Sequence, residues 1–211
     1  YSVYDTGVLL APRGVGILLA MYIAAKVAGK FDPRIIILIG LLITAASMWV
    51  ITGWSLQMDW HWIVYTGLLQ GVGSVFVFIP LNGIAFSTLP MRMRTDGSAL
   101  LYLFRSLGGS FGISIMTTML ARNMQTSHED LASHITASSM NAVDPSSADR
   151  LGALGDAALQ LVNLEINRQA AMIAYLDDFK LMMILLVLMS PLVFFLKPGK
   201  PAAGQRPVMA D

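Results

Sequence analysis

Long runs of hydrophobic residues, each with no charge or a single charge, alternate along the chain with short polar connections. About 20 helical residues, rising about 1.5 Å each, span a hydrocarbon layer about 30 Å thick. Each run is long enough for one such crossing. The pattern therefore predicts an all-α polytopic membrane protein with five transmembrane helices, over about residues 6–25, 35–56, 62–89, 98–120 and 179–196.

Lysine and arginine in the connections favour one orientation in the membrane. They occur in the first and third connections and in the tail, residues 197–211, whereas connection 53–61 has none. Because basic residues concentrate in short cytoplasmic loops, we expect these two connections and the tail to be cytoplasmic and segment 121–178 to lie outside. The basic residues concerned are Lys26, Lys30, Arg34, Arg92, Arg94, Lys197, Lys200 and Arg206.

The outer segment 121–178 has two parts. The stretch HEDLASHITASSMNAVDPSSAD is polar and rich in helix breakers, which is typical of a loop. From residue 151 onward, apolar and polar positions fall on opposite helical faces, which predicts an amphipathic helix leading into the last span. Such a helix either packs at the membrane interface or offers a docking surface to a periplasmic partner. The apolar face comprises Leu151, Leu154, Ala158, Leu161 and Val162, and the polar face Asp156, Gln160, Asn163 and Asn167.

Composition excludes several other classes of protein. Charged residues make up 13% of the chain, against about 25% in soluble domains, and no basic tract is dense enough to follow a nucleic-acid backbone. The chain has no cysteine, and its three histidines lack carboxylates at ligand spacing, so we expect neither a metal site nor an enzyme. It opens at Tyr1, close to the first span, which suggests the C-terminal piece of a longer protein.

Four polar residues lie at membrane depth in the predicted spans: Arg13, Gln70, Asn82 and Arg105. A charge costs about 2.5–3.5 kcal/mol at the centre of an inserted helix, so each arginine needs an explanation. Either its head reaches the nearer headgroups, or it is held against a neighbouring helix, where Asn82 is a possible partner for Arg105. No Asp or Glu lies deep in a predicted span, and Asp5 and Asp177 lie at span edges. We therefore expect any coupling carboxylate to lie outside this chain.

Glycine pairs and one proline predict how two of the spans pack. Small residues let membrane helices approach closely. The third span has Gly67 and Gly71 four residues apart. The fourth has Gly108 and Gly112 four residues apart, and Gly109 and Gly112 share a helical face with Arg105. Pro80 removes a backbone hydrogen bond and should kink the third span.

Three stretches carry a family resemblance: LLAPRGVGILLAMYIAAKVAGKFDPR, GLLQGVGSVFVFIPLNGIAFSTLP and GSALLYLFRSLGGSFGISIMTTMLAR. In this order they resemble the fourteen-span drug:proton antiporters of the major facilitator superfamily, the EmrB/QacA type. The resemblance implies that the five spans form most of the C-terminal lobe, with an N-terminal lobe missing. The first, third and fourth would lie near the central cavity or the other lobe. The first connection, with Lys30, Asp32 and Arg34, resembles the superfamily's charged loop, although Gly29 stands where that motif has Asp.

This resemblance implies a proton-driven multidrug efflux transporter that exports lipophilic drugs by alternating access and needs no cofactor. It also implies a bacterial inner-membrane location, contact with the lipid bilayer, and partnership with a periplasmic adaptor and an outer-membrane duct. Arg105 is then expected to be a structural or conformational residue. The alternatives are a carrier of a metabolite or nutrient on the same scaffold, and a non-transporting sensor or assembly subunit. Drug contacts are expected at Met21, Tyr22, Phe76 and Phe78.

Overall fold

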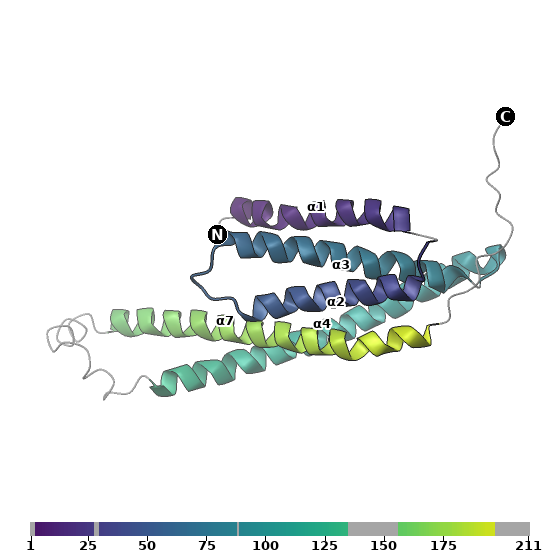
Figure 1. Ribbon diagram of the computed structural model, residues 1–211. Helices are drawn as coiled ribbons and strands as arrows, with labels where there is room; N and C mark the ends of the chain where they lie inside the picture. Colours follow the sequence, from purple (N-terminus) through teal and green to yellow (C-terminus); the bar gives the residue numbers. More distant parts are fainter. Residues whose placement is uncertain (1–2, 28–29, 88, 135–155, 197–211) are drawn as a thin grey trace.

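In the computed structural model the chain forms five long α-helices (Figure 1). The structure describes residues 3–27, 30–87, 89–134 and 156–196, and no strand occurs among them. Two short 3-10 helices accompany the α-helices. The elements are α1 (Val3–Val27), α2 (Pro33–Thr52), α3 (Trp60–Ser87), η1 (Met91–Met93), α4 (Arg94–His134), α7 (Asp156–Met189) and η2 (Ser190–Phe195).

The helices pack in an order that differs from their order along the chain. α3 lies between α1 and α2, α2 also packs against α7, and α7 packs against α4. The sequence of neighbours is therefore α1, α3, α2, α7 and α4. In Figure 1 the first four follow from top to bottom on the left, and α4 crosses α7 obliquely. α4 has its main helical contact with α7, so the two ends of this series, α1 and α4, are each packed on one side.

Small residues bring α3 close to both of its neighbours. A Cβ atom added at Gly16 of α1 would lie 2.6 Å from the carbonyl oxygen of Leu68, and one added at Gly40 of α2 would lie 2.9 Å from that of Gly73. Both distances are too short for a real contact, so these backbones touch only because the side chains are absent. A hydrogen bond adds to the α2–α3 contact, because the hydroxyl of Ser47 donates to the carbonyl oxygen of Thr66 at 3.0 Å.

α4 and α7 are longer than a membrane crossing requires. α4 has 41 residues, or about 62 Å of helix at 1.5 Å per residue, about twice the hydrocarbon thickness. The expectation of a loop from residue 121 is therefore wrong for residues 121–134, which continue α4. The reason is local, since no glycine or proline occurs between Gly112 and Pro145 to end the helix. The extended ends contact each other, with His128 Nε2 3.1 Å from Asn163 Oδ1.

Parts of the expected outer segment fall outside the described residues. These parts are the loop beyond His134 and the positions Leu151 and Leu154. α7 is described from Asp156, but the side chains of Ala158, Leu161 and Val162 are not. The apolar face of the predicted amphipathic helix therefore stays a prediction, while Gln160 and Asn163 of its polar face are exposed.

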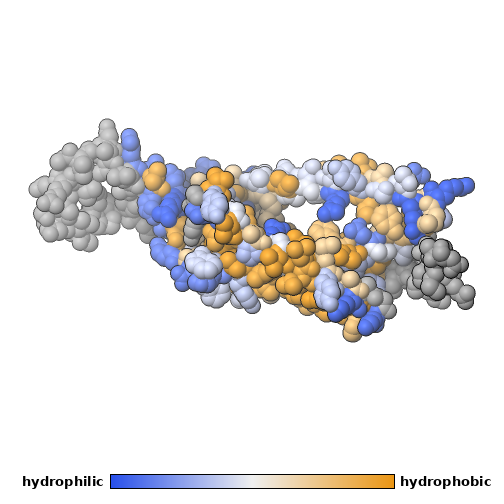
Figure 2. All heavy atoms as spheres, turned by 90° about the horizontal axis from the view of Figure 1, so that it is seen from above, coloured by the Kyte–Doolittle hydropathy of each residue, from blue (hydrophilic) through white to orange (hydrophobic). Residues whose placement is uncertain are grey.

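Apolar and polar side chains are distributed over the surface as expected for membrane-spanning helices. Among the described residues, five helices are long and apolar enough to cross a membrane. Large apolar side chains such as Leu18, Phe111 and Ile113 are each 68% exposed. Figure 2 shows hydrophobic residues over the middle of the bundle and hydrophilic residues toward its ends. The chain is a multi-pass membrane protein.

Antiparallel packing brings the basic connections to one end of the bundle. The connection from α1 to α2, with Lys30, and the connection from α3 to α4, with Arg92, lie at the end where η2 also finishes (Figure 1). The connection from α2 to α3 lies at the opposite end. This grouping agrees with the charge pattern, and the assignment of the basic end to the cytoplasm stays a prediction.

Candidate functional site

Arg105 of α4 contacts an aromatic ring of α3. Its guanidinium carbon lies 4.5 Å from the centroid of the Phe78 ring, within the range of a cation–π interaction. Phe78 itself is 44% exposed. The contact joins two helices that otherwise pack on different neighbours. The guanidinium group of Arg105 thus contacts a neighbouring helix, and its partner there is Phe78, not Asn82.

The glycines beside Arg105 have no such neighbour. Cβ atoms added at Gly108, Gly109 and Gly112 would meet nothing within 4 Å in the described part of the chain. No residue of α4 is buried in the described part of the chain. We expected this glycine face to contact another helix, and within the described residues it does not. It is available to lipid or to a further protein segment.

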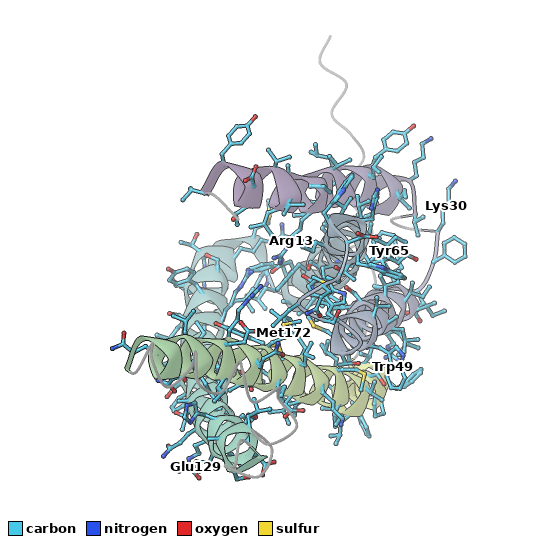
Figure 3. The ribbon with its side chains drawn as sticks, turned by 90° about the vertical axis from the view of Figure 1, so that its left-hand side faces the viewer. Arg13, Lys30, Trp49, Tyr65, Glu129 and Met172 are labelled. Carbon is cyan, nitrogen blue, oxygen red and sulfur yellow. The ribbon has the colours of Figure 1, made fainter. Side chains whose placement is uncertain are left out.

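Arg13 of α1 lies against the glycine pair of α3. A Cβ added at Gly67 would lie 3.8 Å from the Cβ of Arg13, and one added at Gly71 would overlap the carbonyl oxygen of Arg13. The close approach thus involves the arginine backbone. The Arg13 side chain is exposed, and in Figure 3 it lies on the side of α1 that faces the other helices. Within the described residues it has neither an ion pair nor a side-chain hydrogen bond.

The remaining polar residues of α3 bond locally or toward α2. The amide nitrogen of Gln70 lies 3.9 Å from the sulfur of Met48. The amide of Asn82 donates to the carbonyl oxygen of Phe78 at 2.8 Å, one turn earlier on the same helix. α3 continues as a helix through Pro80, and the kink expected there stays a prediction.

The four expected drug contacts do not form one surface. Met21 and Tyr22 are exposed on α1, and the amine of Lys26 lies 4.4 Å above the Tyr22 ring. Phe76 instead packs into the small core with Ala20, Ala24 and Val75. It lines an apolar pocket of about 220 Å³ between α1, α2 and α3, below the usual range of about 300–1,000 Å³ for ligand sites. Phe78 is therefore the only one of the four brought beside a polar residue at membrane depth.

The first connection has a structural role that its sequence motif did not predict. The carboxylate of Asp32 accepts a hydrogen bond from the backbone nitrogen of Arg34 at 3.0 Å and caps α2, with Pro33 in the first turn. Lys30 is exposed and points away from the helices (Figure 3). No ion pair links Lys30, Asp32 and Arg34 where the structure describes them. The motif therefore begins a helix, and a role as a charged latch stays a prediction.

One buried carboxyl group was missed. Asp178 of α7 is 6% exposed, and its Oδ1 atom has no hydrogen-bond partner among the described residues. Ala174 and Ala170, one and two turns earlier, are fully buried. The spacing of four between these residues was a readable signal of a buried face. The burial of Asp178 was not predicted because its exposed neighbour, Asp177, marks the edge of the hydrophobic run.

Known proteins similar to this chain include multidrug resistance proteins. No protein-family model matches the chain. Probable multidrug resistance protein EmrY of Escherichia coli is 28% identical over 208 residues, 97% of this chain and 40% of EmrY. A multidrug resistance protein B homolog of Mycobacterium tuberculosis is 32% identical over 157 residues, 74% of this chain and 28% of that protein. Fatty acid resistance protein FarB of Neisseria gonorrhoeae is 25% identical over 97% of this chain and 40% of FarB. The chain thus spans well under half the length of these relatives.

Proposed function

Because the homologues of this chain are multidrug resistance transporters of the EmrB and EmrY type, we propose that it forms the C-terminal part of a proton-driven multidrug efflux transporter. This transporter would sit in a bacterial inner membrane and export lipophilic drugs by alternating access. The observation that best supports the proposal is the similarity to EmrY along 97% of the chain, in whose described part five helices are long and apolar enough to span a membrane.

The class of substrate is proposed from the names of the relatives. Two relatives are named for resistance to many drugs and one for resistance to fatty acids. Fatty acids are lipophilic, so the proposal specifies lipophilic compounds.

The other parts of the proposal concern topology and partners. The basic end of the bundle would face the cytoplasm, and the extended ends of α4 and α7 would project into the periplasm. There they could contact an adaptor that leads to an outer-membrane duct. An N-terminal lobe would complete the cavity, since alternating access in such folds depends on two lobes that move about a central site.

Efflux of a fluorescent lipophilic cation from energised, pump-deficient bacteria tests this function. The complete transporter containing this chain would be expressed as wild type, Arg105→Ala and Arg122→Ala at matched membrane levels, with and without an uncoupler. Arg122 is the matched control because it is an exposed arginine on the same helix. We expect uncoupler-sensitive efflux that Arg105→Ala reduces and Arg122→Ala leaves intact.

Other outcomes discriminate between the alternatives. Efflux that survives Arg105→Ala would still support an exporter, but the contact of Arg105 with Phe78 would then play no part in the transport cycle. No efflux from inserted wild type over a broad panel of lipophilic compounds would contradict drug export. Such a result would favour a metabolite carrier, or a sensor if no solute is moved at all.

A further inference from the structure

Asp178 is buried among apolar and small side chains with part of its hydrogen-bonding capacity unused. The residue is 6% exposed, and Ala170 and Ala174 on the same face of α7 are fully buried. The Oδ1 atom is buried and has no partner in the described part of the chain. An ionised carboxylate in such surroundings is costly unless it is paired, whereas a neutral carboxylic acid is tolerated. The site therefore favours a carboxyl group that carries a proton for at least part of the time.

The elements packed against α7 bring no ion-pair partner to this carboxyl. α2 has a single charged residue, Arg34, at the end of the helix opposite Thr52, and η2 has none. On α4, Arg105 contacts Phe78 and His128 contacts Asn163. The other charged residues of α4 are Arg94, Asp96, Arg122, Glu129 and Asp130, and those of α7 nearest in sequence are Asp177 and Lys180. No salt bridge from any of them to Asp178 occurs among the described residues.

The residue next to Asp178 lines an open pocket. The pocket has a volume of about 380 Å³ and lies between α2 and α7, lined by Trp49 and Thr52 of α2, by Asp177 and Lys180 of α7, and by apolar residues of α7. Thr52 is the last residue of α2, so the pocket lies at an end of the bundle. Asp177 is exposed there, whereas Asp178 is buried. A proton that enters from this end would therefore meet a polar side chain one residue away from the buried carboxyl.

We propose that Asp178 is a proton-binding site of the transport cycle, reached from the Thr52 end of α2. The carboxylate takes up one proton to become a neutral carboxylic acid, and the same oxygen–hydrogen bond breaks when the proton is released. This inference rests on the proposed function for its role in transport, and it replaces the expectation that the coupling carboxylate lies outside this chain. Buried carboxyl groups in membrane helices commonly serve as proton relays.

Two transport assays on the complete transporter, reconstituted in liposomes, test the proposal. One measures movement of a fluorescent lipophilic cation driven by a pH gradient, and the other measures its exchange across the membrane at equal pH. We expect Asp178→Asn to lose the gradient-driven transport and to retain exchange, because the binding site and the conformational change remain. The matched control Asp177→Asn should retain both, and Asp178→Glu should recover gradient-driven transport with a shifted pH profile.

Opposite results overturn the proposal. Gradient-driven transport by Asp178→Asn at the wild-type level would show that the proton is carried elsewhere. Loss of both activities, in Asp178→Asn and Asp178→Glu alike, would assign the residue a structural role only.

Infrared spectroscopy of the purified protein separates this inference from the proposed function. A carbonyl band of a protonated carboxylic acid should titrate with pH in wild type and in Asp177→Asn, and it should be absent from Asp178→Asn. If wild type transports none of the compounds tested, the drug-export proposal fails, but the band still supports proton binding at Asp178. Identical spectra for wild type and Asp178→Asn would overturn the inference, whatever the transport result.

Discussion

Two glycines in identical sequence motifs should respond oppositely to the same substitution. Gly71 and Gly112 each end a Gly-x3-Gly pair in a membrane helix. A Cβ at Gly71 would overlap the carbonyl oxygen of Arg13 and would lie 3.1 Å from the nitrogen of Ile17. A Cβ at Gly112 would meet nothing within 4 Å. We therefore predict that Gly71→Ala destabilises the chain and that Gly112→Ala does not.

The size of the difference follows from two opposing effects. Replacing glycine by alanine inside a helix gains about 0.8–1.0 kcal/mol of helix propensity at either position, so this gain cancels between the two variants. Overpacking costs about 1–3 kcal/mol, and it applies only at Gly71. There the overlapping atoms belong to the α1 backbone and cannot move aside as a side chain can. The free energy of unfolding should therefore be about 1–3 kcal/mol lower for Gly71→Ala than for Gly112→Ala, a factor of about 5–150 in the equilibrium constant.

Reversible unfolding of the 211-residue chain in mixed micelles measures this difference. Increasing proportions of a denaturing detergent would be added, with tryptophan fluorescence as the signal, since Trp60 and Trp62 begin α3. Gly108→Ala is a second control, because its Cβ would also meet nothing within 4 Å. Equal unfolding free energies for Gly71→Ala and both controls would refute the close α1–α3 contact on which the reasoning depends.

Two further contacts lead to predictions about the free energy of unfolding. Ser47→Ala removes the buried hydrogen bond to the Thr66 carbonyl and should lower the unfolding free energy by about 0.6–1.7 kcal/mol in the same detergent assay. Thr52→Ala, whose hydroxyl bonds only within α2, should have a smaller effect, and equal effects would contradict the interhelical role of Ser47. A double-mutant cycle of Arg105→Gln and Phe78→Leu should give a coupling of about 0.5–1 kcal/mol, and additive effects would show that the cation–π contact is absent.

The five helices could be predicted from the sequence because each crossing needs a long uncharged run. Their limits were less predictable, since hydropathy reports which residues suit lipid and not where a helix stops. α4 continues through polar residues as far as His134 because nothing in that stretch breaks a helix. α2 shows the opposite case: its hydrophobic run reaches Leu56, but the helix ends at Thr52, before Gly53.

The residues of the candidate site were more predictable than their pairing. Arg105 was predicted as a charge in a hydrophobic run, and Phe78 as a drug contact, but nothing in the spacing indicated that the two would meet. Phe76, two residues from Phe78, points to the opposite side and packs in the core. Asp178 was missed because its exposed neighbour Asp177 marks the edge of the hydrophobic run, although its spacing of four from the buried Ala174 indicated a buried face.

The contrast between the two glycine motifs also bears on what lies beyond this chain. In α3 the motif has a partner, because the backbone of α1 fills the space that side chains would occupy. In α4 the same motif is open, next to an arginine that contacts Phe78. A glycine face gains nothing from lipid, which packs equally well against larger side chains. Since the chain spans only 40% of the EmrY length, the proposed N-terminal lobe is the partner that best accounts for this face. Arg105 and Phe78 would then lie beside the surface along which the two lobes move.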